Sequence, residues 1–161
     1  MAISGIEGLT VRDVLLNDVS RTSRIFLRTL GDLKEDELQR SPAGGLSPVI
    51  WQVGHVTATD AYFARLCGSD ISLPDGFDAL FGRGTGGVKA YPSLAAVKPL
   101  YERGQAALEA VVQSAEMGRA VESKNFKTVA EALSFNCFHR GYHIGKICTL
   151  RALMGYAPLF T

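Results

Sequence analysis

The three histidines are the residues of this chain whose spacing most directly suggests chemistry. His139 and His143 lie four positions apart, so in a helix their side chains share one face, with Cβ atoms roughly 5–6 Å apart. Two imidazoles at this spacing can bind one divalent metal ion, each nitrogen about 2.0–2.1 Å from it. If His55 reaches the same point from another helix, three neutral ligands leave coordination positions open for water or a substrate, as in catalytic zinc sites.

The same histidines also have ordinary structural interpretations. An inward histidine is commonly a core residue with one hydrogen bond, and a surface pair is commonly solvated. The segment is not the HExxH motif of zinc proteases, because Arg140 follows His139 where that motif has glutamate. Cys137 lies two residues from His139, and residues two apart on a helix do not face each other. Cys137 and Cys148 are therefore predicted to be core thiols rather than nucleophiles.

Helical geometry also predicts which side chains surround the histidines. At about 100° per residue, the face of His55 carries Trp51 and Tyr62, and these three side chains are expected to point into the protein. Seven residues on or beside the histidine faces are candidates for contacts around the metal or for the substrate pocket, although each also has a packing interpretation. They are Trp51, Gln52, Thr59, Tyr62, Asn136, Tyr142 and Lys146.

Gly82, Gly84 and Gly87 match the spacing of the dinucleotide-binding motif GxGxxG. The context argues against that function, because no strand is predicted before them and no βαβ unit surrounds them. They belong to an irregular stretch over 69–92, which is long for a connection in a compact domain. We expect it to be a flexible crossover that can act as a lid over the site.

Four long segments with helical periodicity must position these residues. They are predicted at about 11–30, 48–67, 93–112 and 129–154. Thr10 and Thr128 are each followed three residues later by an acidic residue, which is typical of helix starts. Ser47 is predicted as an N-cap with Pro48 in the first helical position, and Pro99 is predicted to kink the third helix or break its first turn.

The remaining segments are predicted to be loops and turns. Residues 32–37 form a charged stretch that we expect to be a solvated turn, and 116–127 is a second polar connection. No run alternates between apolar and polar residues with period two, so no sheet is expected. Four long helices in a small domain favour an all-α four-helix bundle.

Composition narrows the classes of function. The chain has 161 residues and a formal charge of +1, which fits one domain over 1–161 and argues against nucleic-acid binding through phosphate neutralisation. The longest uncharged run, 41–59, contains prolines, glycines and polar residues, so no membrane span is predicted. The first ten residues lack the pattern of a secretory signal, and three cysteines without a CxxC pair suggest reduced thiols. A cytoplasmic location is therefore expected.

Several motifs resemble those of the DinB/YfiT-like family. The segment Trp51-Gln-Val-Gly-His55-Val resembles its helix-2 motif, and the run from His139 to Ile147, preceded by the segment 128–133, resembles its helix-4 motif. Tyr91-Pro-Ser93 is similar to the family's entry to helix 3, and 151–158 is similar to its usual ending. The resemblance covers nearly the whole chain, with the order and spacing of all three histidines.

The resemblance implies an antiparallel four-helix bundle with a long crossover from helix 2 to helix 3. It also implies one divalent metal ion, often zinc or nickel, held by His55, His139 and His143, and it suggests homodimers. Several relatives are transferases that use a low-molecular-weight thiol such as bacillithiol or mycothiol, and others are thiol-dependent isomerases. Relatives often have glutamine where this chain has Lys146, so a cation near the site either changes the surroundings of the metal or suggests an anionic ligand.

Two hypotheses of different class follow. The first is a metal-dependent enzyme with a small-molecule substrate or thiol, its catalytic residues unassigned. The alternative is a non-catalytic stress-response or binding module whose three-histidine site is structural or vacant. A pocket beside an open coordination position favours the enzyme, whereas a fourth protein ligand favours a structural site. We also expect a homodimer, since a small apolar-rich bundle with few surface charges tends to leave an exposed apolar strip.

Overall fold

The computed structural model describes residues 8–42, 44–87 and 90–160, and this part of the chain is helical without a strand. The only β-type pairing within it is an isolated bridge between Ala120 and Thr128. The all-α prediction is therefore confirmed. The elements in chain order are α1 (Val11–Arg28), α2 (Glu35–Gln39), α3 (Val49–Leu66), α4 (Phe77–Phe81), α5 (Leu94–Ser114) and α6 (Val129–Leu153).

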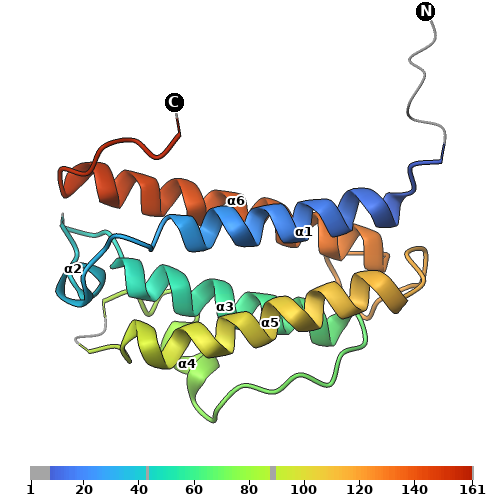
Figure 1. Ribbon diagram of the computed structural model, residues 1–161. Helices are drawn as coiled ribbons and strands as arrows, with labels where there is room; N and C mark the ends of the chain where they lie inside the picture. The colour runs from blue at the N-terminus through green and yellow to red at the C-terminus, as the bar shows by residue number, and fades with distance from the viewer. Residues whose placement is uncertain (1–7, 43, 88–89, 161) are drawn as a thin grey trace, which may run out of the picture.

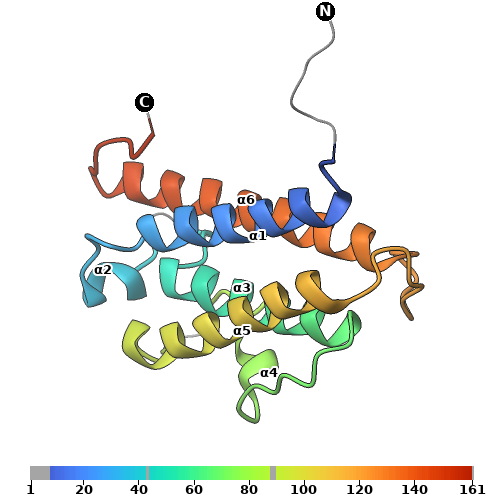
Figure 2. The same cartoon turned by 45° about the vertical axis from the view of Figure 1, so that its right-hand side comes forward.

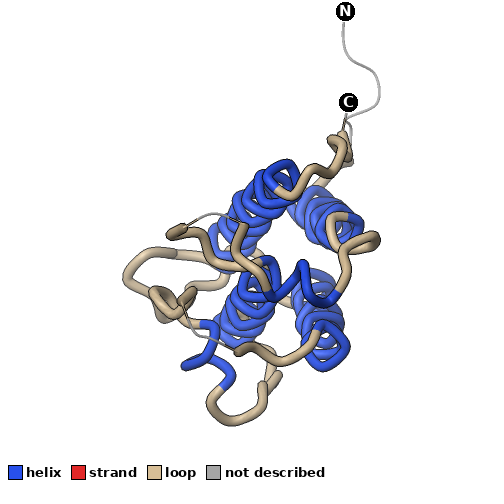
Figure 3. Tube along the Cα trace, turned by 90° about the vertical axis from the view of Figure 1, so that its left-hand side faces the viewer, coloured by secondary structure: helices blue, strands red, loops and turns tan. Residues whose placement is uncertain are grey.

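The four long helices form a bundle of two parallel pairs, and the two pairs run in opposite directions. Helices α1 and α6 run side by side in one direction, while α3 and α5 run together in the opposite direction (Figure 1). Helix α3 also packs against α6, and α1 packs against α5, so the four occupy the corners of a square when viewed end-on (Figure 3). Because α3 and α5 are parallel, the connection 67–93 must return along the bundle. It carries α4, which packs against α3 (Figure 2).

The helix starts follow the signals in the sequence, with one shift. The Thr10 side chain caps α1 in a capping box with Asp13, and the Thr128 side chain accepts from the backbone N–H of Glu131 at the start of α6. Helix α3 begins at Val49, one residue later than predicted, because the backbone of Pro48 is extended (ψ 164°) and occupies the cap position. Helix α5 continues through Pro99, so its first turn is not broken.

Two short helices were not predicted, because five residues are too few to show a period. Helix α2 overlaps the stretch 32–37, which is not simply a solvated turn: Leu38 is buried, and the Asp32 carboxylate accepts from Arg151 Nη2 at 2.8 Å. Helix α4 buries Phe77 and Phe81. The Phe81 ring lies over Gly54 of α3, where a Cβ atom would come within 2.1 Å of Phe81 Cδ1. The glycine therefore allows α4 to approach α3 closely.

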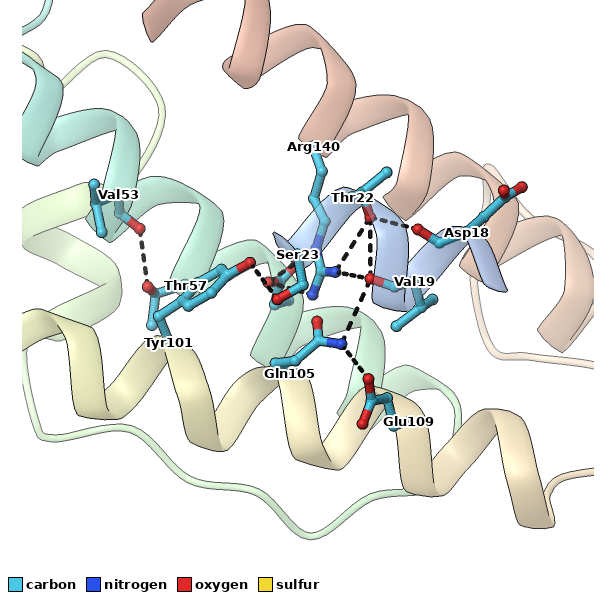
Figure 4. A network of polar contacts seen from close by, with 11 residues as sticks. Asp18, Val19, Thr22, Ser23, Val53, Thr57, Tyr101, Gln105, Glu109 and Arg140 are labelled. Atoms are coloured by element: carbon cyan, nitrogen blue, oxygen red, sulfur yellow. Dashed lines mark hydrogen bonds and ion pairs between the residues drawn. The ribbon is translucent and has the colours of Figure 1, made fainter. Parts of the chain in front are cut away.

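The core consists of two apolar clusters that meet at a polar layer. One cluster contains Phe26 and Tyr101, and the other contains Val19 and Leu108. Arg140 of α6 touches both, since its guanidinium donates to the Val19 carbonyl at 3.0 Å and lies 5.9 Å from the Tyr101 ring centroid (Figure 4). The layer lies in the middle of the bundle and joins α1, α3, α5 and α6.

No helix in the described part of the chain is both long and apolar enough to cross a membrane. Residues 1–7, which carry most of the segment considered for a secretory signal, lie outside the described residues.

Candidate metal centre

The structure brings the three histidines together between α3 and α6. One ring nitrogen from each of His55, His139 and His143 lies within 4.8 Å of the other two. The Nε2 atoms of His139 and His143 are 3.1 Å apart, and the His55 ring centroid is 5.2 Å from that of His139 and 4.9 Å from that of His143. His143 is buried and the other two are half-buried. The i,i+4 pair and the distant histidine therefore face one point.

Hydrogen bonds at Nδ1 fix two of the rings. The Nδ1–H of His143 donates to Gln52 Oε1 at 2.6 Å, and Gln52 is oriented by its own Nε2, which donates to the Ser47 carbonyl at 3.3 Å. The Nδ1–H of His55 donates to the Phe81 carbonyl at 2.8 Å. We assign these tautomers from the partners, since a carbonyl can only accept. The Nε2 atom of each ring then carries a lone pair, as in the histidine ligands of metal sites, and that of His143 lies 3.1 Å from Nε2 of His139.

The donor geometry fits a divalent ion. Two nitrogens bound at 2.0–2.1 Å to a tetrahedral ion lie about 3.3 Å apart, close to the 3.1 Å between Nε2 of His139 and Nε2 of His143. His139 Nδ1 is buried without a hydrogen-bond partner, so no hydrogen bond at this atom fixes that ring. Among the described residues, no cysteine, aspartate or glutamate joins this group of possible ligands.

The surroundings hold His139 and His143 neutral. Burial, and then the nearby His55 and Arg140, lower the pKa of His139 to about 4. Burial, and then the charges of His139, His55 and Lys146, lower the pKa of His143 to about 3. Both rings are therefore unprotonated at neutral pH, which is the form that binds a metal ion.

The crossover is attached to this centre at two points. Besides the Phe81 carbonyl, Thr85 accepts a hydrogen bond from Trp51 Nε1 at 3.0 Å, and Trp51 stacks on His55 with ring centroids 4.7 Å apart. The Thr85 hydroxyl lies 2.7 Å from the Leu80 and Gly82 carbonyls. The glycine-rich segment 82–87 therefore follows α4 rather than a strand, and it lies against the histidines instead of forming a dinucleotide-binding loop.

A pocket of about 690 Å³ opens at the three histidines. Trp51 and Gln52 line it from α3, and Tyr142 and Lys146 line it from α6. The Tyr142 ring packs edge-on against His143, with centroids 5.1 Å apart, and the Lys146 ammonium lies 5.2 Å from the Tyr142 centroid. Arg83 of the crossover also lines the pocket. No aspartate or glutamate is among its described lining residues.

Three of the candidate residues lie outside this pocket. Thr59 and Tyr62 line a shallower hollow on another side of His55. The Tyr62 side chain is 46% exposed, so the expectation that it points into the bundle is wrong: the face it shares with His55 lies at the edge of α3, next to α4. Asn136 is fully buried one turn before His139, and neither atom of its amide group has a protein partner.

Sequence reasoning missed a buried ion pair beside the centre. Arg140 and Asp60 are both fully buried, with Nε to Oδ1 at 3.0 Å and Nη2 to Oδ2 at 2.7 Å. Arg140 directly follows His139, and Asp60 lies on the helix that carries His55, so the pair joins the two ligand-bearing helices. The sequence signal for this pair is that Asp60 and Arg140 are an acidic and a basic residue on helix faces that are otherwise apolar.

The fold and site together define a class of protein, an all-helical bundle with a three-histidine candidate metal centre in a pocket between two of its long helices. The family model described as the DinB superfamily matches residues 19–147. The chain therefore belongs to the DinB superfamily. A search of curated proteins gave no match.

Proposed function

We propose that this protein binds one divalent metal ion, zinc or nickel, through Nε2 of His55, His139 and His143. The observation that carries the proposal is the convergence of the three rings, two of which are held by hydrogen bonds at Nδ1. Three protein ligands leave a coordination position open toward the pocket. This arrangement favours a reactive site over a structural one, which would have four protein ligands.

We further propose that the centre serves a transferase that uses a low-molecular-weight thiol. A bound divalent ion lowers the pKa of a coordinated thiol or water. The described lining of the pocket has no carboxylate that could act as a general base for water, which favours the thiol. In the transfer, the thiol sulfur forms a bond to an electrophilic carbon, the leaving group departs with its electron pair, and the thiol proton passes to solvent. A thiol-dependent isomerase would use the same residues.

Metal content tests the first proposal. Protein purified without an affinity tag is expected to carry about one divalent ion per chain by elemental analysis. His143→Ala should lose the ion, because two histidines are too few donors for a stable open site. The helical circular dichroism spectrum should persist, because the apolar clusters of the bundle do not depend on the metal. A His143→Ala variant with full metal content would overturn the site.

Thiol-dependent transfer tests the second proposal. Loss of free thiol in the presence of an alkyl halide should be accelerated by the metal-loaded protein and not by His143→Ala. Cys137→Ala is the matched control, because this thiol is half-buried outside the pocket and burial raises its pKa to about 11. An inactive Cys137→Ala variant that keeps its metal would point to cysteine chemistry instead. Metal binding without any interaction with thiols would favour the non-catalytic binding module.

A further inference from the structure

We propose that the pocket selects a small thiol that carries an additional anionic group, and that Arg83 and Lys146 bind this group. The inference deepens the proposed function and rests on it. Arg83 and Lys146 would then determine the specificity for this class of substrate. Arg83 lies in the crossover, outside the histidine motifs.

The charges around the pocket carry the argument. Its described lining contains two basic side chains, Arg83 and Lys146, and no carboxylate. Neither cation has an ion-pair partner among the described residues, whose four ion pairs all lie elsewhere. Three neutral histidines also leave the two positive charges of a divalent ion uncompensated, and one thiolate supplies a single negative charge. A cleft lined by one sign of charge favours ligands of the opposite sign.

Both cations belong to segments that contact the candidate metal centre. In the sequence, Arg83 is two residues from Phe81 and two from Thr85. The Phe81 carbonyl accepts a hydrogen bond from His55, and the Thr85 hydroxyl accepts one from Trp51. The crossover is therefore attached to the centre on either side of Arg83. Lys146 follows His143 by three residues on α6, where its ammonium lies over the Tyr142 ring. Its positive charge is among the causes that lower the pKa of His143.

The dimensions of the pocket agree with a small ligand. Its volume of about 690 Å³ falls in the usual range of small-molecule sites, about 300–1,000 Å³. Arg83 and Lys146 come from different elements and line this same pocket. A ligand with sulfur at the histidines and an anionic group a few bonds away can therefore meet both a planar guanidinium and an ammonium, and guanidinium groups pair well with carboxylates.

Thiol binding to the cobalt-loaded protein tests the proposal without measuring activity. Sulfur-to-cobalt charge-transfer absorption is titrated with three thiols of similar size: 3-mercaptopropionate, 2-mercaptoethanol and cysteamine, which are anionic, neutral and cationic. The comparison is made for each thiol between wild type and the double variant Arg83→Gln/Lys146→Gln, so differences in thiol acidity cancel. Arg24→Gln/Lys124→Gln is the control, because it removes the same charge from exposed positions outside the pocket.

The double variant should bind 3-mercaptopropionate about tenfold more weakly than wild type, since two partly exposed charge contacts are worth roughly this factor. Its affinity for 2-mercaptoethanol should change less than twofold, and cysteamine should bind more tightly. The control variant should match wild type. In wild type, added salt should weaken the binding of 3-mercaptopropionate more than that of 2-mercaptoethanol.

The outcomes separate this inference from the function on which it rests. If wild type binds cobalt but none of the three thiols, the thiol-transferase proposal fails. If all three thiols bind and the double variant leaves their relative affinities unchanged, the proposed function stands and the anion-selective role of Arg83 and Lys146 is wrong. The ligand-field absorption of the cobalt protein before thiol addition verifies that both variants still bind the metal.

Discussion

Gln52 shows how one residue outside the three-histidine cluster can determine which nitrogen of a histidine is available to a metal ion. Its Oε1 accepts from Nδ1–H of His143 at 2.6 Å and so holds the Nε2 lone pair toward the other two rings. Loss of such a partner typically weakens metal affinity about 10- to 100-fold. The residue also precedes His55 by three positions, so one turn of α3 supplies both a ligand and the group that orients another ligand.

We therefore predict that Gln52→Leu lowers zinc affinity about 10- to 100-fold, as measured by competition with a chromophoric chelator at neutral pH. Gln105→Leu is a suitable control, because Gln105 is a half-buried glutamine that bonds to Glu109 at 2.7 Å in the polar layer and not to a histidine. Its zinc affinity should stay within about twofold of wild type. Equal zinc affinities for Gln52→Leu and wild type would show that Gln52 does not orient His143.

The neutral histidines also predict how the metal-free protein responds to acid. The folded-state pKa of His143 is about 3 and that of His139 about 4, both below the ordinary value of 6.5. The unfolded chain therefore binds more protons as pH falls through 6.5, and the free energy of unfolding should decrease until the pH reaches the folded-state values. Between pH 7 and pH 5, His143 alone should cost about 2 kcal/mol of stability.

Urea denaturation of the chelator-treated protein at the two pH values measures this loss. His143→Gln should reduce the difference, because one of the two titrating rings is removed while the carboxylates titrate as before. A pH dependence identical to that of wild type would mean that His143 is not held neutral by the fold.

At the residue scale, the sequence predicted the convergence of the three histidines better than the residues that surround them. The spacing of His139 and His143 was sufficient to place them on one face, because helical geometry is local. The partner of His55, in contrast, is a backbone carbonyl at Phe81, and Arg83 follows it in a segment without periodicity. Neither can be inferred from residue type, since both depend on how the crossover folds back onto α3.

At the scale of elements, the two ligand-bearing helices are joined by the Asp60–Arg140 ion pair. Both side chains are fully buried, and Arg140 also donates to the Val19 carbonyl of α1. A buried pair contributes little net stability compared with apolar residues of similar size, but removal of one partner leaves a charge without compensation. We therefore expect the pair to constrain the alignment of α3 with α6 more than it stabilises the fold.

Arg140→Met is accordingly predicted to lower the free energy of unfolding by about 3–5 kcal/mol, as measured by chemical denaturation. The double variant Asp60→Leu/Arg140→Met should recover most of this loss, because no buried charge remains. Lys98→Met is the control. It breaks an exposed pair with Glu102 at 3.3 Å and should cost less than about 1 kcal/mol. A double variant no more stable than Arg140→Met would argue against an uncompensated Asp60 as the cause.

The long helices were predictable because each carries several turns of apolar periodicity and a start signal such as Thr10 or Thr128. The short helices α2 and α4 were not, because they form through tertiary contacts. Leu38 and Phe81 are buried because α2 and α4 pack against α3. The same limit applies to Tyr62: a helical wheel gives the face of a residue, but the packing of neighbouring helices decides whether that face is covered.

At the scale of the whole molecule, the first half of α6 and the start of α1 leave apolar side chains uncovered. Leu9, Val11 and Phe138 are 61%, 60% and 68% exposed. Together with Val14 and Phe135 they line a groove of about 830 Å³ between the two helices, in which the described charged residues are Asp18 and Glu131. Exposed apolar surface of this kind is typical of an interface.

We predict that a second copy of the chain covers this groove, as expected for a homodimer. Phe138 lines both the groove and the histidine pocket, so an interface centred here would also form part of the pocket mouth. Light scattering at micromolar concentration should give twice the 17.3 kDa mass of one chain. The variant Val11→Asp/Phe138→Asp should be monomeric, because four carboxylates would then be buried in a symmetric apolar contact. The control variant Leu153→Asp, at an exposed position outside the groove, should stay dimeric. A wild-type protein that scatters light only as the monomer would refute the dimer.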